Sequence, residues 1–119
     1  MNKISIIIFA LFFLIVTTFT YAHPPEEMIF SYDAKNKILS IGVAHQVQNI
    51  KKHFVSKINI KLNGKDLIMQ NFLNQTNVKV QAVSYAMVDL KKGDVIEVSA
   101  VCNQSGELTK KFKIDKINK

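Results

Sequence analysis

Apart from methionine, four side chains in this sequence have the chemistry to bind a soft or borderline metal ion. They are His23, His45, His53 and Cys102. Imidazole nitrogen and thiolate sulfur together suit iron, copper or zinc, and the thiol must lose its proton to bind. Two of the histidines flank the polar loop in VAHQVQNIKKHF, and the cysteine ends an apolar run just before a turn. Residue types alone leave two interpretations open: a shared metal site, or surface histidines with a buried, inert cysteine.

Other reactive arrangements have weaker support in the sequence. Cys102 with His45 or His53 is a conceivable nucleophile and base pair, but no glycine-rich turn or oxyanion arrangement stands out. The paired acids Glu26 and Glu27 are more typical of a solvated edge than of an acid and base pair. The chain has a formal charge of +7, and its permanently positive side chains are all lysine, with no arginine. Since no aromatic-rich basic stripe accompanies them, we expect attraction of small anions and no nucleic-acid partner.

Short apolar runs that recur about every ten residues after position 22 predict strands rather than helices. Asn63-Gly64 joins two of these runs and is the strongest short hairpin signal, because both residues accept positive φ. The predicted strands are Met28–Tyr32, Ile38–Ala44, Phe54–Leu62, Lys65–Phe72, Val78–Val88, Val95–Cys102 and Glu107–Ile114. Seven such strands are too many for one exposed sheet of a small domain. We therefore expect an all-β fold, an immunoglobulin-like antiparallel β-sandwich.

These strands would bring the candidate ligands to strand ends. His45 follows one predicted strand, His53 precedes the next, and Cys102 is the last residue of another. Strand ends and loops are where a rigid sandwich presents functional groups. Because a sandwich gathers the ends of many strands, the loop after Ala44 and the turn after Cys102 can meet although they are far apart in the sequence.

The first 22 residues, MNKISIIIFALFFLIVTTFTYA, have a lysine-bearing start, an apolar run and small residues near the end. This pattern is typical of a secretory signal peptide. We expect cleavage after Ala22, residues 23–119 as one domain, and a periplasmic or secreted location. An uncleaved membrane anchor is the alternative, and otherwise we expect no membrane association. Cys102 is the only cysteine, so in an oxidising compartment it is a buried thiol, an intermolecular bridge or a metal ligand.

The segment VAHQVQNIKKHFVSKINIKLNG, residues 43–64, resembles the iron-site segment of the superoxide reductases, also called the desulfoferrodoxin iron-binding domain. In that family a histidine follows a strand, a short loop leads to a second histidine, and an apolar strand starts directly after it. VCNQSGE, residues 101–107, looks like the family's C-N-x-H-G turn. His23 stands where the family keeps its N-terminal histidine ligand. The resemblance covers essentially all of residues 23–119.

The resemblance implies a mononuclear iron centre that reduces superoxide, and thus an oxidoreductase. His23, His45 and His53 would be nitrogen ligands, and Cys102 the axial sulfur ligand. The family's fourth nitrogen ligand is the histidine of C-N-x-H-G, and Ser105 stands in its place. The loop between the second and third histidines is also longer than is typical in the family. The missing imidazole bears on the expected activity more than on the fold or on metal binding, because it opens an equatorial position.

Further parts of the sequence would serve the same reaction. Lys51 and Lys52 lie directly before His53, and we expect their charges to attract the superoxide anion. The electron is expected to come from a separate donor protein. Cleavage after Ala22 would give His23 a free α-amine, which can bind a metal near neutral pH, and either this amine or a water would fill the place of the nitrogen that Ser105 lacks.

Two other functions fit the same residues. A cysteine with two histidines can form a blue-copper site, so a copper-binding electron carrier is the first alternative. Such proteins usually place a histidine or methionine shortly after the cysteine, and none follows Cys102. A metal-free β-sandwich binding module is the second alternative, and in it the histidines would be incidental. Metal content and a visible spectrum distinguish the three functions.

Overall fold

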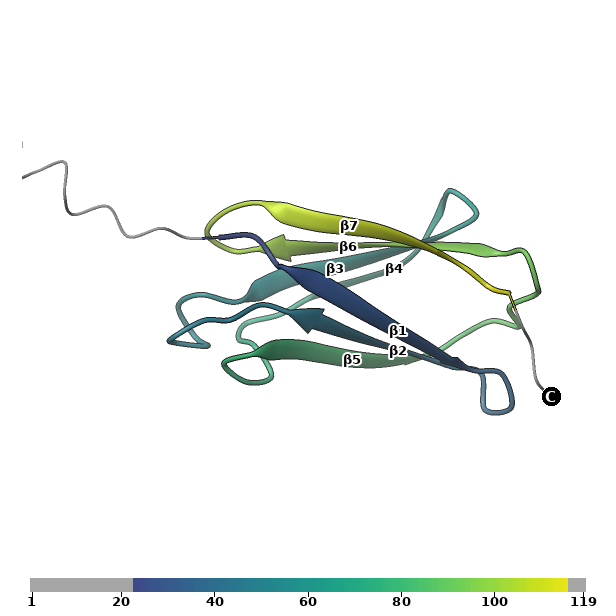
Figure 1. Ribbon diagram of the computed structural model, residues 1–119, viewed down its shortest axis with the longest axis horizontal. Helices are drawn as coiled ribbons and strands as arrows, with labels where there is room; N and C mark the ends of the chain where they lie inside the picture. The colour runs from purple at the N-terminus through teal and green to yellow at the C-terminus, as the bar shows by residue number, and fades with distance from the viewer. Residues whose placement is uncertain (1–22, 116–119) are drawn as a thin grey trace, which may run out of the picture.

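The computed structural model describes residues 23–115, which form seven β-strands (Figure 1). The strands are β1 Glu27–Asp33, β2 Ile38–Ala44, β3 Val55–Leu62, β4 Lys65–Asn71, β5 Val80–Ala86, β6 Val95–Cys102 and β7 Glu107–Lys113. The predicted signal peptide lies outside the described residues. Within residues 23–115 no helix is long and apolar enough to cross a membrane.

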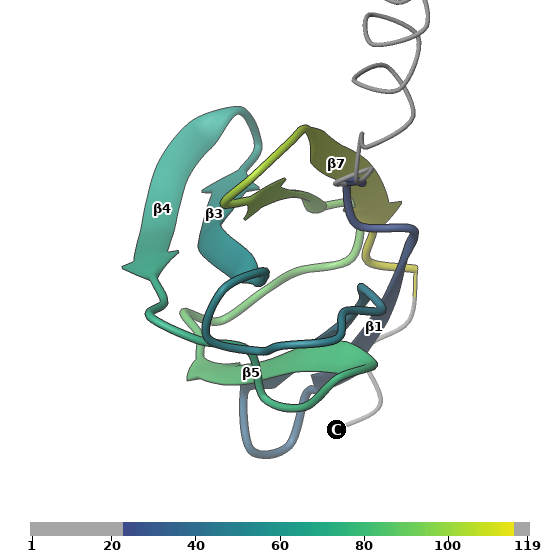
Figure 2. The same ribbon diagram turned by 90° about the vertical axis from the view of Figure 1, so that its left-hand side faces the viewer.

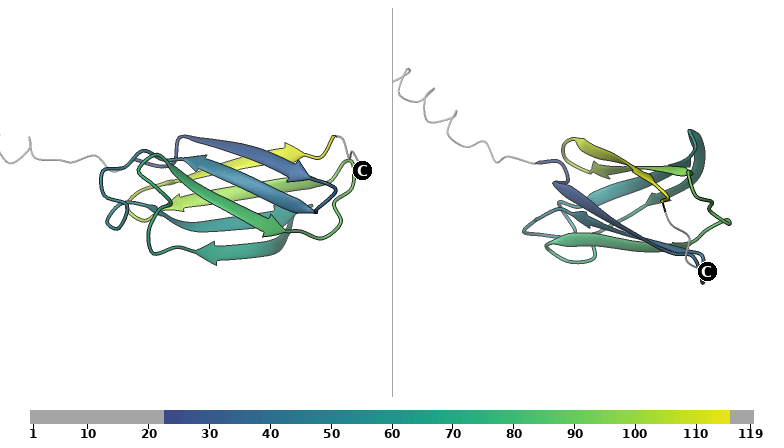
Figure 3. Two further views of the ribbon diagram at one scale, coloured as in Figure 1. Left: turned by 90° about the horizontal axis from the view of Figure 1, so that it is seen from below. Right: turned by 45° about the vertical axis from the view of Figure 1, so that its right-hand side comes forward.

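The strands form two antiparallel sheets that face each other (Figures 2 and 3). One sheet has the order β1-β2-β5, and the other has the order β4-β3-β6-β7. The prediction of an all-β antiparallel sandwich with seven strands is confirmed. In a constant-type immunoglobulin domain the fourth strand joins the sheet of the first two. Here β4 pairs with β3 instead.

The turn between β3 and β4 explains this pairing. Asn63 and Gly64 have φ values of 50° and 83°, the positive pair that a two-residue hairpin turn requires. The Asn63 side chain also accepts a hydrogen bond from the Val95 amide at 2.9 Å, which ties the turn to the start of β6. Because so short a turn leaves no length for a crossover, β4 must lie beside β3.

The core lies between the sheets and is built on the alternation of β3 and β6. Ile58 and Ile60 of β3 are 0% exposed, as are Ile96, Val98 and Ala100 of β6. Burial of each large aliphatic side chain stabilises the fold by about 1.5–3 kcal/mol. Cys102 is the last member of the same inward row and is 5% exposed. The Cys102 thiol therefore lies where the core reaches the end of the sandwich.

Four segments meet at that end (Figure 1). They are residues 23–26 before β1, 45–54 between β2 and β3, 72–79 between β4 and β5, and 103–106 between β6 and β7. Neighbouring antiparallel strands run in opposite directions, so every second connection returns to the same end. We call it the histidine end, because it holds His23, His45 and His53. Figure 2 looks onto it.

Candidate metal centre

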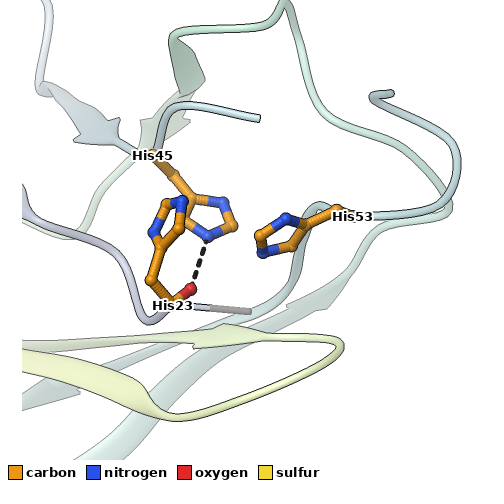
Figure 4. A group of neighbouring side chains, drawn as sticks. All are labelled: His23, His45 and His53. Carbon is orange, nitrogen blue, oxygen red and sulfur yellow. Dashed lines mark hydrogen bonds between the residues drawn. The ribbon is translucent and has the colours of Figure 1, made fainter. Parts of the chain in front are cut away.

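The structure brings the three predicted histidines together at the histidine end (Figure 4). One ring nitrogen from each of His23, His45 and His53 lies within 4.8 Å of the others. The ring centroids are 5.1 Å apart for His23 and His45, 5.1 Å for His23 and His53, and 4.7 Å for His45 and His53. Imidazoles this close, with nitrogens facing one another, can bind a single metal ion through one nitrogen each.

Cys102 adjoins this group through one of its histidines. Its sulfur lies 3.1 Å from Nε2 of His53 and is approached by the Gln104 amide at 3.5 Å. The thiol is free and buried. The group of mutually close donor atoms consists of the three histidines, and the sulfur lies beside it. All four predicted ligands are thus at one end of the sandwich, although they come from three separate parts of the chain: the segment before β1, the loop between β2 and β3, and the end of β6.

His45 is the most enclosed of the histidines, and a glutamine holds it. The His45 ring is 0% exposed, and its Nδ1 lies 2.8 Å from Oε1 of Gln75. Gln75 is 1% exposed and comes from the loop between β4 and β5. Gln75 could not be found from the sequence, because a glutamine in a polar loop carries no signal of burial. Its contact with His45 depends on two loops that only the folded chain brings together.

His23 is held in place by contacts of the backbone that follows it. The Glu26 amide donates to the Ala44 carbonyl at 2.8 Å. Pro24 packs against Gly106 so closely that a Cβ on that glycine would lie 2.9 Å from the Cβ of Pro24. The segment before β1 is therefore fixed against both the β2 end and the β6–β7 turn.

A network of hydrogen bonds fixes the position of His53 relative to Cys102. The Asn103 side chain accepts from the Phe54 amide at 2.9 Å and donates to the Lys52 carbonyl at 3.0 Å. The Asn103 amide in turn donates to the Phe54 carbonyl at 3.0 Å. Since Asn103 follows Cys102 and the two loop residues flank His53, this clamp holds the imidazole against the thiol.

The surroundings of His53 favour its neutral form. Burial lowers the pKa of His53, and the neighbouring His45 and His23 lower it further, while the backbone of His23 acts in the opposite direction. A neutral imidazole is the form that binds a metal.

The remaining predicted residues lie at the surface around the centre. Lys51 and Lys52 are exposed on the loop that leads to His53. The Lys52 carbonyl accepts hydrogen bonds from the side chains that follow Cys102, so this residue also has a backbone role. Ser105 is exposed in the β6–β7 turn.

No protein-family model, curated protein or solved structure matches this chain. The resemblance to superoxide reductases therefore rests on the residues of the site, and it stays a hypothesis.

Proposed function

We propose that this chain is a mononuclear metal-binding protein whose metal is iron, held in the manner of the superoxide reductases. The main support is the convergence of three imidazoles at one end of the sandwich, with a thiol in contact with one of them. His23, His45 and His53 would supply nitrogen, and Cys102 would supply sulfur. Because secondary structure and hydrogen bonds already hold the four residues together, little ordering remains to oppose metal binding.

The donor atoms fit iron and other borderline ions. The histidine group contains no carboxylate among the residues that the structure describes. Hard cations such as Ca²⁺ and Mg²⁺ are bound by oxygen ligands, so the group does not suit them. Imidazole with thiolate suits iron, copper and zinc. The second contact of each ring also matters, since metal-binding histidines usually have their other nitrogen hydrogen-bonded, and His45 meets this condition through Gln75.

Bound iron would supply one electron to a small oxidant such as superoxide. The residues of the chain would hold the centre and control access to it. Cys102 would present its sulfur from the core side, where the sandwich excludes water. Lys51 and Lys52 are exposed beside the centre, so their charges would draw in an anion. The electron would come from a separate protein, and the N-terminal segment would direct export to the periplasm or the medium.

Metal content and the visible spectrum test this proposal. Protein purified after expression of the full-length chain should contain about one iron per chain. The oxidised protein should show a sulfur-to-metal charge-transfer band, and Cys102→Ser should abolish that band. Ala100→Ser is the matched control, because Ala100 is the preceding inward residue of β6 and is 0% exposed. It should keep the band, since it adds the same hydroxyl to the core and leaves the thiol in place.

Each other outcome has a distinct meaning. A blue-copper spectrum with copper in the protein would replace iron by the copper-binding alternative. Absence of bound metal after exposure to iron, copper and zinc would leave the metal-free binding module. Iron with an unchanged band in Cys102→Ser would remove Cys102 from the ligands and with it the superoxide reductase type of centre.

A further inference from the structure

The side chain of Gln75 makes several hydrogen bonds that join separate segments at the histidine end. Its side chain is 1% exposed. The Nε2 amide donates to the carbonyl oxygens of His45 at 2.7 Å and of Asn77 at 2.9 Å. The Oε1 atom accepts from the Val55 amide at 3.2 Å and faces Nδ1 of His45 at 2.8 Å. One side chain therefore contacts the residue that follows β2, the first residue of β3 and the loop that leads into β5.

These partners determine which way the amide points. A side-chain amide has two hydrogens on its nitrogen and none on its oxygen. Both hydrogens of Gln75 are directed to carbonyl oxygens, and the oxygen already accepts from a backbone amide. A rotated amide would face two carbonyls with its oxygen and one N–H with its nitrogen, and would lose all of these bonds. Because the oxygen has no hydrogen, the bond to His45 needs a proton on Nδ1 of the ring.

We propose that Gln75 is a positioning residue that keeps the proton of His45 on Nδ1, so that this histidine binds metal through Nε2. The inference rests on the proposed metal-binding function and extends it to the atom that binds. A neutral histidine can bind metal through either nitrogen, and a hydrogen bond at one nitrogen selects the other. The other nitrogen, Nε2, lies on the side of the ring that faces the His23 carbonyl oxygen (Figure 4).

The contact on that side is consistent with a cation site. Nε2 of His45 lies 3.0 Å from the His23 carbonyl oxygen. With the proton on Nδ1, the neutral ring has a lone pair at Nε2, and a carbonyl oxygen is also an acceptor. Two acceptors at this distance repel each other unless a proton or a cation lies close to both. A metal ion at Nε2 would remove this repulsion.

The tautomer can be read directly in the metal-free protein. A long-range ¹H–¹⁵N spectrum of the histidine side chains distinguishes a protonated from a bare ring nitrogen. We expect Nδ1 of His45 to be protonated and Nε2 to be bare. A His45 ring with a bare Nδ1, or with a proton on both nitrogens, would overturn the inference. This reading needs no metal, so it stands apart from the success or failure of the proposed function.

Variants of Gln75 then test the consequence for binding, with Co²⁺ as a coloured probe. Gln75→Leu removes the acceptor, and we expect Co²⁺ affinity to fall about 10- to 100-fold and the Nδ1–H signal to be lost. Gln75→Glu keeps an acceptor and should retain that signal. Gln81→Leu is the matched control, because Gln81 is a second buried glutamine, 4% exposed, whose hydrogen bonds go to Thr76 and Ala82.

The proposed metal-binding function and the proposed role of Gln75 would fail in different ways. If the wild-type protein binds no metal, the proposed function fails, while the tautomer measurement still decides the role of Gln75. If the wild-type protein binds Co²⁺ and both leucine variants lose the same affinity, Gln75 has no special role and the inference is wrong, while the metal site remains.

Discussion

The substitution Gly106→Ala should weaken the metal centre through Pro24, without touching any ligand directly. Gly106 lies in the β6–β7 turn with a φ of +76°, and an added Cβ would lie 2.9 Å from the Cβ of Pro24. Pro24 directly follows His23. The substitution should therefore have two effects, one on the turn itself and one on the position of His23.

The two effects differ in size and in kind. A side chain in the left-handed region costs about 1–2 kcal/mol relative to glycine, and each kcal/mol lowers the melting temperature of a domain of this size by about 4–8 °C. The contact with Pro24 must also open from 2.9 Å to at least 3.4 Å. A displacement of about 0.5 Å is the tolerance within which a binding site must be held. We therefore expect metal affinity to fall about tenfold or more.

Gly93→Ala separates the two effects. Gly93 has a φ of +94° in the turn before β6, at the opposite end of the sandwich, and a Cβ there would have no neighbour within 4 Å. Urea unfolding in the presence of a chelator should give a similar loss of stability for both variants. A Co²⁺ titration should show weaker binding for Gly106→Ala only. Equal affinities in the two variants would refute the idea that the contact with Pro24 positions His23.

Three further predictions concern the clamp, the first histidine and the far end of the sandwich. Asn103→Ala should destabilise the fold by about 1 kcal/mol and weaken Co²⁺ binding, whereas Asn63→Gly, which removes side-chain hydrogen bonds at the far end, should leave binding unchanged. One extra residue ahead of His23 should weaken binding as much as His23→Ala if the α-amine is a ligand, and identical spectra and affinities for the extended and unextended proteins would exclude the amine. Hydrogen bonds from Asn63 and from the Lys91 amide lower the pKa of Asp94 from its ordinary 3.8, so they stabilise the fold above that pH, and this contribution is lost as the pH falls through the lowered pKa. Asp94→Asn should flatten that part of the curve of unfolding free energy against pH, and an unchanged curve would contradict the assignment.

The strands could be predicted from the sequence because their signals are local. Alternating apolar residues fix which side chains face inward along β6, and the same alternation puts Cys102 on the row of Ile96 and Val98. The bounds of β2 and β6 agree with the prediction, while β5 is shorter at both ends, Val80–Ala86 in place of Val78–Val88. The outer residues of that run join the loops instead, since Val78 accepts from the Val47 amide outside the strand ladder.

The candidate ligands could also be named from the sequence, because few residue types bind such metals and the chain contains few of them. The surroundings of the ligands could not. Gln75 holds His45 across a separation of 30 positions, and Pro24 contacts a glycine near the other end of the chain. Neither residue differs in type or pattern from an ordinary loop residue. Their roles arise from the meeting of four connections at one end of the sandwich. Strand formation depends on neighbours along the chain, whereas the position and orientation of each imidazole depend on packing between segments that only the tertiary fold brings into contact.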